Sequence, residues 1–284
     1  MGNSLGDFIE ALSDQKEPNV SREDTMLTPQ QLAHFSTFGF LLLPRAFTAE
    51  EMTALMRAAE AVWKEDPAPE ENAERRLNYF VERQPLLTRL VADERIYPVI
   101  EALMGSEFIW VGSEGNISNR SEVRWHPDRK YYRSGEEQRI DYPQVKVMIY
   151  LEKVGRDTGC LRVIPGSHRM PYHKDLADQE ISPDALPFGL AGRDIPCAAL
   201  ESEPGDVILF NHCIWHASFG GGRGRRYIAL KFAAKPFAAD HLISLERYTG
   251  KVFQPHEAFL NSDEPRIRAL VENLPRYATG CIGD

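Results

Sequence analysis

Apolar and polar positions in the first third of the chain repeat at the spacing of helices. Residues 28 to 39 begin with a Thr-x-x-Gln capping pattern followed by an apolar face, which predicts a capped helix. Residues 48 to 65 repeat this pattern and place Met, Leu, Ala and Val on one face. Between them, the apolar run 40 to 43 predicts a buried strand. Residues 86 to 103 carry a third helical pattern, which Pro98 should divide into two helices.

After about residue 106 the pattern changes to short β-rich runs separated by Gly, Pro and Asp. Such runs are typical of an all-β sandwich or barrel. They occupy residues 108 to 111, 145 to 151, 161 to 164, 207 to 210 and 227 to 232. The tail at residues 264 to 274 returns to helical spacing. The sequence therefore predicts a mainly β fold with flanking α-helices packed on a barrel core.

The same pattern predicts how the chain is organised. Residues 1 to 26 are polar without an apolar period, so we expect a flexible leader before one folded domain over residues 27 to 284. Residues 168 to 200 are irregular, rich in Pro and Gly, and too long for a hairpin loop, which predicts a lid-like insert. Within the domain we expect a helical flank at 27 to 105, a β-barrel core at 106 to 236 and a C-terminal helical cover at 237 to 284.

The composition of the chain argues against several classes of function. The chain has 284 residues, of which 43% are hydrophobic and 26% are charged. Its formal net charge of -9 argues against a nucleic-acid binder, which needs a basic face. The four cysteines form no Cys-x-x-Cys pair, so neither a zinc knuckle nor a redox dithiol is indicated. Because the chain has neither a basic, apolar N-terminal signal nor an apolar run of about 18 residues, we expect a cytoplasmic protein that does not span a membrane.

His126 and Asp128 are the first candidates for chemistry. They lie two residues apart, so an extended strand turns both side chains to one face. Two imidazoles and one carboxylate on one face of Fe(II) leave the other face open for oxygen and a co-substrate. His216, which precedes the glycine-rich connection 217 to 222, can supply the second imidazole. His-Pro-Asp is also turn-prone, so a surface turn is the competing interpretation.

Three blocks of sequence accompany these residues. Residues 27 to 41 read Leu-Thr-Pro-Gln-Gln-Leu through Phe-Gly-Phe-Leu, and residues 159 to 168 read Gly-Cys-Leu-Arg-Val-Ile-Pro-Gly-Ser-His. Gly-Asp-Val at 205 to 207 and Trp-His-Ala-Ser at 215 to 218 complete the pattern. From residue 27 to about 235, the chain resembles the phytanoyl-CoA dioxygenase family of Fe(II)- and 2-oxoglutarate-dependent oxygenases.

The resemblance implies a double-stranded β-helix core, also called jelly-roll or cupin-like, with N-terminal and C-terminal helices packed outside it. It implies that His126, Asp128 and His216 are the iron ligands and the catalytic centre. His212 competes for the last position. The family, however, places that ligand about eleven residues after the glycine of its Gly-Asp turn, which favours His216.

In the family, an arginine at the start of the strand after the distal histidine binds the far carboxylate of 2-oxoglutarate. Arginine suits this role because its planar fork binds carboxylates through two hydrogen bonds. Arg225 fits the family spacing, and Arg226 competes with it because the glycine loop is shorter here. Neighbours on a strand face opposite ways, so only one of the two can enter the barrel. Ser218 resembles the hydroxyl that supports this carboxylate, and a solvent-exposed loop serine is the alternative.

The strand predicted at 145 to 151 supplies further candidates. Lys146, Met148 and Tyr150 share one face, while the apolar residues between them share the other and should pack outward against helices. The first set would line the barrel, where a buried lysine needs an anionic neighbour. The alternative is an edge strand with Lys146 in water. Asn116 precedes the metal pair where the family uses a polar side chain to contact 2-oxoglutarate.

The resemblance implies an enzyme that uses Fe(II), 2-oxoglutarate and O2, and that releases succinate and CO2. Hydroxylation of a C–H bond, or a related desaturation or cyclisation, is the implied reaction. Halogenating relatives replace the metal carboxylate with a small residue, so Asp128 argues against halogenation. Two alternatives stay open: a cupin-like metal-dependent isomerase or hydrolase, and a non-catalytic barrel that binds a small molecule.

No motif specifies the substrate. We expect a small organic molecule as the partner, and neither a nucleic acid nor a membrane. Basic residues around the predicted mouth favour an anionic substrate slightly over a merely solvated surface; these are Arg124, Arg129, Lys130 and Arg162. Nothing in the sequence indicates an oligomeric state.

Overall fold

The computed structural model describes residues 27–66, 74–129, 132–133, 136–137, 142–180, 189–222, 224–249 and 252–282. The leader expected at residues 1 to 26 and the place of Lys130 lie outside these ranges. Among the described residues, none of the helices has the length and apolar character needed to cross a membrane.

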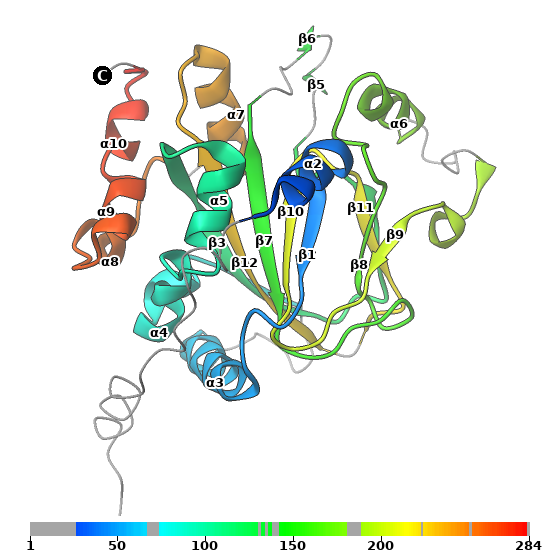
Figure 1. Ribbon diagram of the computed structural model, residues 1–284, viewed down its shortest axis with the longest axis horizontal. Coiled ribbons are helices and arrows are strands. Elements are labelled where there is room, and N and C mark those ends of the chain that lie inside the picture. The colour runs from blue at the N-terminus through cyan, green and yellow to red at the C-terminus, as the bar shows by residue number, and fades with distance from the viewer. Residues whose placement is uncertain are drawn as a thin grey trace, which may run out of the picture.

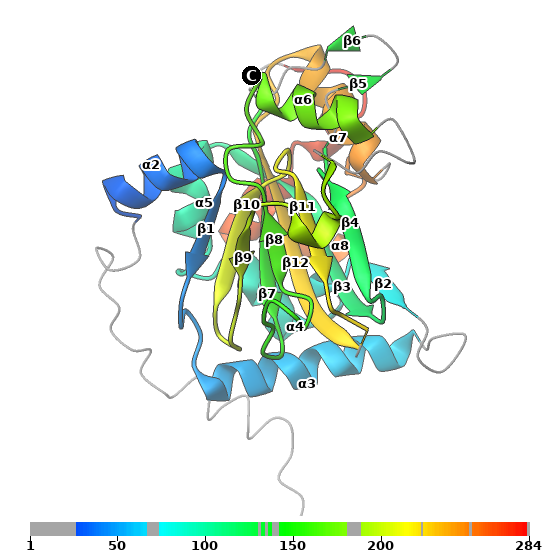
Figure 2. The same ribbon diagram turned by 90° about the vertical axis from the view of Figure 1, so that its right-hand side faces the viewer.

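Two antiparallel sheets form the centre of the fold (Figures 1 and 2). The larger sheet has the order β1-β10-β7-β12-β3-β2 and the smaller has β4-β11-β8-β9, so most neighbouring strands are distant in sequence. The larger sheet contains β1 (Phe40–Leu43), β2 (Arg75–Asn78), β3 (Phe108–Ser118), β7 (Gln144–Tyr150), β10 (Val207–Asn211) and β12 (Arg225–Ala234). The smaller contains β4 (Glu122–His126), β8 (Leu161–Val163), β9 (Ala198–Leu200) and β11 (His216–Phe219), and β5 (Tyr132–Arg133) pairs separately with β6 (Glu136–Glu137). This is the expected double-stranded β-helix core.

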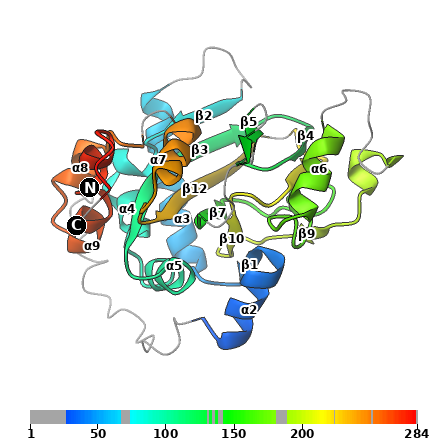
Figure 3. The same ribbon diagram turned by 90° about the horizontal axis from the view of Figure 1, so that it is seen from above.

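Helices pack outside this core, as predicted (Figures 1 and 3). Those preceding β3 are α2 (Pro29–Phe38), α3 (Ala49–Glu65), η1 (Val81–Arg83), α4 (Pro85–Thr88), η2 (Arg89–Val91) and α5 (Tyr97–Met104). Those following it are α6 (Tyr172–Glu180), η4 (Gly192–Asp194), α7 (Ala239–Thr249), α8 (Glu257–Leu260), α9 (Pro265–Val271) and α10 (Leu274–Tyr277). Helices α5 and α9 contact β3 of the larger sheet, and α3 runs across the lower ends of the strands in Figure 2.

The first two helices begin where their capping patterns predict. The hydroxyls of Thr28 and Thr48 each accept a hydrogen bond from the third helical residue, whose side chain accepts one in return from the capping backbone. Helix α2 ends at Gly39, whose φ of 83° is the left-handed conformation that glycine adopts readily. The chain then turns directly into β1, which is the strand expected at residues 40 to 43.

Three segments differ from the prediction. Residues 86 to 103 do form separate helices, since η2 ends at Val91 and α5 begins at Tyr97, but the break precedes Pro98. Pro98 lies in the first turn of α5, where its missing N–H would have no partner within the helix in any case. The insert at 168 to 200 is not irregular throughout, because it contains α6, η4 and β9, and β9 pairs with β8. The glycine-rich connection at 217 to 222 is partly strand β11. Pairing with other strands makes β9 and β11 regular, and local composition carries no sign of this pairing.

The two faces of β7 contact different cores, as its alternation predicts. Val145, Val147 and Ile149 belong to the large cluster between the six-stranded sheet and the helices. Met148 and Tyr150 belong to a second cluster between the two sheets, together with residues of β8 and β10. The inner face of the large sheet therefore looks into the space enclosed by the barrel. The expected division of the chain into one domain with a lid-like insert stays a prediction.

Candidate metal centre

His126, Asp128 and His216 come together at one end of the smaller sheet. His126 is the last residue of β4 and His216 is the first of β11, and the two are direct partners in the antiparallel pairing. Asp128 follows β4, so it is not on the strand that the sequence suggested. One potential ligand atom from each residue lies within 4.8 Å of the others. The structure thus brings the three predicted ligands into one cluster. A surface turn, the competing interpretation of His-Pro-Asp, does not account for this arrangement.

Both imidazoles are oriented through the nitrogen that faces away from this cluster. His126 Nδ1 lies 2.7 Å from the carbonyl oxygen of Arg124, and His216 Nδ1 lies 3.0 Å from that of Ile214. A carbonyl can only accept, so each Nδ1 carries the proton. The unprotonated Nε2 of each ring is then available as a ligand, which is the arrangement metal-binding histidines commonly use.

The charges of the cluster suit a divalent cation. Burial raises the pKa of the Asp128 carboxyl, but Lys146 and His216 act in the opposite direction and hold it well below its usual range. Burial lowers the pKa of His216 to about 4, against the opposing attraction of Asp128. At neutral pH the cluster therefore offers the ionised carboxylate of Asp128 and the neutral imidazole of His216, the forms in which these groups bind a metal. Two nitrogen ligands and one oxygen ligand on one side fit Fe(II).

His212, the competing candidate, is not part of this three-residue group. Its side chain is buried, and its backbone carbonyl accepts a hydrogen bond of 2.9 Å from the amide of Arg129, the residue after Asp128. His212 therefore supports the segment that carries Asp128. His168, in the Pro-Gly-Ser-His turn, is likewise outside the group and packs against Gly39.

A cavity of about 410 Å³ opens beside the cluster, between the two sheets. Eight of the nine predicted site residues line it: Asn116, His126, Asp128, Lys146, Met148, His216, Ser218 and Arg225. The ninth, Arg226, faces away and forms ion pairs of 3.0 Å with Glu152 and 3.2 Å with Glu60. Adjacent residues of β12 face opposite sides of the sheet, so only Arg225 can reach the cavity.

Arg225 is a buried cation at the end of this cavity. Its side chain donates to the carbonyl oxygen of Gly159, and its guanidinium lies 5.9 Å and 5.8 Å from the rings of Tyr150 and Tyr227. Within the described part of the chain, no carboxylate forms an ion pair with it. Ser218, which is 5% exposed, lines the same cavity and is not a solvent-exposed loop residue. A buried arginine beside a hydroxyl is suited to an incoming carboxylate.

Asn116 and Lys146 also face the cavity. The side-chain nitrogen of Asn116 is buried without a hydrogen-bond partner in the structure, so it can donate to a bound molecule. Lys146 Nζ lies 3.0 Å from Asp128 Oδ2, which supplies the anionic neighbour that the sequence required. The alternative of an edge strand is wrong, because β7 lies between β10 and β12 and Lys146 is 7% exposed.

Of the basic residues expected at the mouth, Lys130 lies outside the described residues, and Arg124, Arg129 and Arg162 do not line the cavity. Arg124 is exposed, whereas Arg129 and Arg162 are buried and donate to Gln144 and to the carbonyl of Arg193. None of these three lines the cavity, whose lining cations are instead Arg76, Arg120, Lys146 and Arg225. Arg129 and Arg162 are therefore engaged by partners elsewhere in the fold. The anionic character of the substrate stays a prediction.

Sequence reasoning also missed a group of ion pairs centred on the buried carboxylate of Glu114. Glu114 on β3 pairs with Lys231 on β12 and with Arg76 on β2, and Glu114 and Arg76 line the cavity. Glu114 and Asn116 alternate on β3, so extending the predicted strand beyond residue 111 would have placed both on one face. Tyr227 lines the cavity as well and follows from the same alternation on β12.

A double-stranded β-helix with two histidines and one aspartate at one end of the smaller sheet defines a class, the Fe(II)- and 2-oxoglutarate-dependent dioxygenases. These oxidoreductases use iron, 2-oxoglutarate and O2. The model of the phytanoyl-CoA dioxygenase family matches residues 35–226, and the chain belongs to this family.

Curated relatives include ectoine dioxygenases. That of Bordetella bronchiseptica is 26% identical over 243 residues, covering 76% of this chain and 78% of the relative. That of Sphingopyxis alaskensis is 27% identical over 225 residues, covering 69% and 72%.

Solved structures show the same fold. HygX from Streptomyces hygroscopicus with nickel and 2-oxoglutarate bound has a TM-score of 0.62 at 20% identity, covering 75% of this chain and 89% of HygX. EctD from S. alaskensis with bound Fe has a TM-score of 0.56 at 24% identity, covering 78% and 80%.

Proposed function

We propose that this chain oxidises a C–H bond of a small organic molecule, with His126, Asp128 and His216 as the ligands of Fe(II). Bound iron supplies the chemistry that couples C–H oxidation to the conversion of 2-oxoglutarate and O2 into succinate and CO2. The observation that carries the proposal is the His-Asp-His cluster at the wall of a cavity that also holds a buried arginine. The residues of the chain bind and orient the reactants and keep water away from them.

Arg225 and Ser218 are proposed to bind the far carboxylate of 2-oxoglutarate. Both residues line the cavity that contains the metal cluster, and Arg225 is buried beside two tyrosine rings. Asn116 is the proposed additional donor, because its buried nitrogen has no hydrogen-bond partner among the described residues. Met148 contributes an apolar wall between the two sheets.

Hydroxylation is the proposed reaction, with desaturation or cyclisation as its related outcomes. The ionised carboxylate of Asp128 occupies the position that halogenating enzymes leave free, which supports hydroxylation over halogenation. The relatives named above are ectoine dioxygenases, and HygX has been solved with hygromycin B bound. Ectoine and hygromycin B are both small molecules, and a cavity of about 410 Å³ suits a substrate of that kind.

The test is anaerobic binding of Fe(II) and 2-oxoglutarate, followed by succinate measurement in air. We expect one Fe(II) per chain and a metal-to-ligand absorption band when 2-oxoglutarate is added. His126→Ala should lose both, while His34→Ala, which changes a histidine packed against Phe38 and Phe40, should keep them. Unchanged iron content in His126→Ala would show that the ligands are misassigned. Metal binding without any succinate across a substrate panel would favour an isomerase or hydrolase instead.

A further inference from the structure

Of the three residues of the proposed metal cluster, Asp128 is the one that lies outside the paired strands. His126 ends β4 and His216 begins β11, whereas Asp128 lies beyond β4. Each imidazole is also fixed by a backbone carbonyl at its Nδ1. The backbone after Asp128 is held by the hydrogen bond from Arg129 to His212, so the rotation of the Asp128 carboxylate depends on the contacts of its own side chain.

Those contacts assign different partners to the two carboxylate oxygens. Lys146 Nζ donates to Oδ2 at 3.0 Å, whereas Oδ1 lies 3.8 Å from His216 Nε2. Oδ1 thus faces the ligand nitrogen of the cluster, and Oδ2 faces the lysine. We propose that Lys146 is a positioning residue, which retains Oδ2 so that Asp128 binds the metal through Oδ1 alone. This inference rests on the proposed function.

Lys146 is well placed to hold this contact. It stands on an inner strand of the large sheet and is 7% exposed. Its partner across the pairing of β7 with β12 is Lys231, and two like charges directly opposite each other are unfavourable. Glu114 offsets this repulsion, because it pairs with Lys231 and also attracts Lys146 electrostatically. Lys146 therefore lies under the attraction of two carboxylates, those of Asp128 and Glu114.

One oxygen or two from Asp128 decides how many positions on the iron stay open. A facial set of three ligands leaves three positions of an octahedral ion, which 2-oxoglutarate and oxygen can share. A second oxygen from Asp128 would take one of them. By engaging Oδ2, Lys146 keeps that position available, and groups that orient metal ligands in this way affect both affinity and activity.

Nitric oxide is a suitable probe, because it binds the open position of Fe(II) without turnover and gives a paramagnetic resonance signal. Wild-type protein loaded anaerobically with Fe(II) and 2-oxoglutarate should take it up. In Lys146→Met at equal iron and 2-oxoglutarate occupancy, we expect affinity for nitric oxide to fall about 10- to 100-fold. Lys146→Gln, whose amide can still donate to Oδ2, should retain most of it.

Lys153→Met is the matched control, because Lys153 is 74% exposed and pairs with Glu203 on the surface. Wild-type protein that takes up no nitric oxide contradicts the proposed function itself. Lys146→Met that binds nitric oxide as tightly as the wild type overturns the positioning role alone. That result would mean that the lysine is only a counter-ion of Asp128.

Two further outcomes also decide the question. Folded Lys146→Met that no longer binds Fe(II) contradicts the proposal, since a second oxygen ligand from Asp128 and the loss of a positive charge beside the site should both strengthen metal binding. If Lys146→Met does not fold, Lys146→Leu is the substitute, because it removes the charge and the donor while leaving the pair of Glu114 and Lys231 intact. This variant carries the same expectation in the nitric oxide assay.

Discussion

Arg225 and Arg226 are neighbours in the chain, yet they have separate surroundings. Arg225 is buried in the cavity beside Tyr150 and Tyr227, and Arg226 pairs with Glu152 on the other side of the sheet. A buried guanidinium without a carboxylate of its own is costly unless a ligand supplies one. At the scale of single residues, this contrast makes Arg225 the proposed anchor of 2-oxoglutarate.

Arg225→Gln should therefore weaken 2-oxoglutarate binding while leaving iron binding intact. Loss of a charge-assisted contact of about 2 kcal/mol corresponds to a roughly thirtyfold rise in the dissociation constant. Anaerobic titration of the Fe(II)-loaded protein with 2-oxoglutarate measures it. Arg226→Gln is the control and should bind as the wild type does; the reverse result would make Arg226 the anchor.

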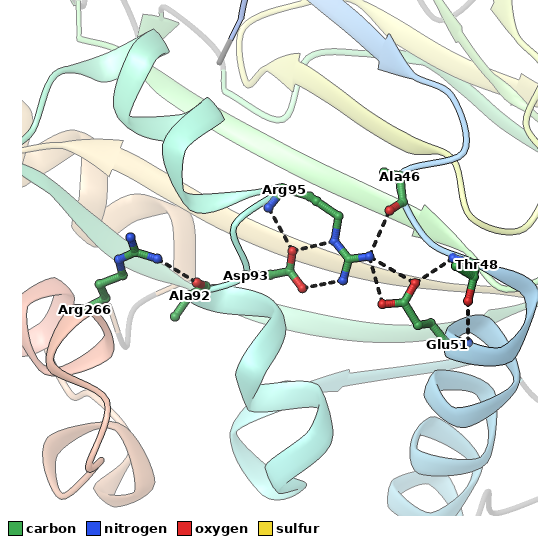
Figure 4. A network of polar contacts seen from close by, with 7 residues as sticks. All are labelled: Ala46, Thr48, Glu51, Ala92, Asp93, Arg95 and Arg266. Carbon is green, nitrogen blue, oxygen red and sulfur yellow. Dashed lines mark hydrogen bonds and ion pairs between the residues drawn. The ribbon is translucent and has the colours of Figure 1, made fainter. Parts of the chain in front are cut away.

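At the scale of elements, a cluster of side chains ties the start of α3 to the segment before α5 (Figure 4). Thr48 and Glu51 cap α3, and Arg95 donates to Glu51 at 2.8 Å, to Asp93 at 2.8 Å and to the carbonyl of Ala46 at 3.0 Å. The Thr28 and Gln31 pair of α2 forms the same capping box, with no arginine contact to Gln31 in the described residues. Glu51 thus has a capping role and a tertiary role, which sequence pattern alone cannot separate.

Glu51→Ala should reduce the free energy of unfolding more than Gln31→Ala does. Loss of a capping interaction costs about 1 kcal/mol, and the half-exposed ion pair with Arg95 adds up to about 1 kcal/mol. Urea unfolding of the full chain measures both variants. Equal losses in the two would mean that the arginine contact contributes nothing to stability.

At the scale of the whole molecule, the proposed metal centre joins two sheets whose strands come from distant parts of the chain. The smaller sheet supplies His126 and His216, and the larger supplies Lys146 and Arg225. Ligands that bind across this space stabilise the folded state relative to the unfolded one, because the unfolded chain cannot assemble the site.

We therefore expect Ni(II) and 2-oxoglutarate together to raise the thermal unfolding temperature. At a concentration one hundred times the dissociation constant, a bound ligand contributes about 2.7 kcal/mol. His126→Ala should lose the shift from both ligands, and Arg225→Gln should lose only the part that 2-oxoglutarate adds. Calorimetry at fixed protein concentration is the measurement. A shift in His126→Ala equal to that of the wild type would place the metal elsewhere.

Residue patterns were enough to predict where helices begin and which faces of a strand are buried. Capping patterns set the starts of α2 and α3, and alternation set the two faces of β7, because both depend on residues close together in the chain. The histidine and aspartate spacing with the Gly-Cys-Leu to Pro-Gly-Ser-His block was enough to indicate the family that the match confirms.

Which side chains contact one another followed only from the arrangement of the strands in space. It placed Arg225 inside and Arg226 outside, and it joined Lys146 to Asp128. It also turned part of the expected insert into β9. These outcomes depend on pairing between strands distant in sequence, and on which long side chain finds a partner across them. The pattern along the chain indicates the side of a strand on which each residue lies, but it does not indicate which residue of another strand it contacts.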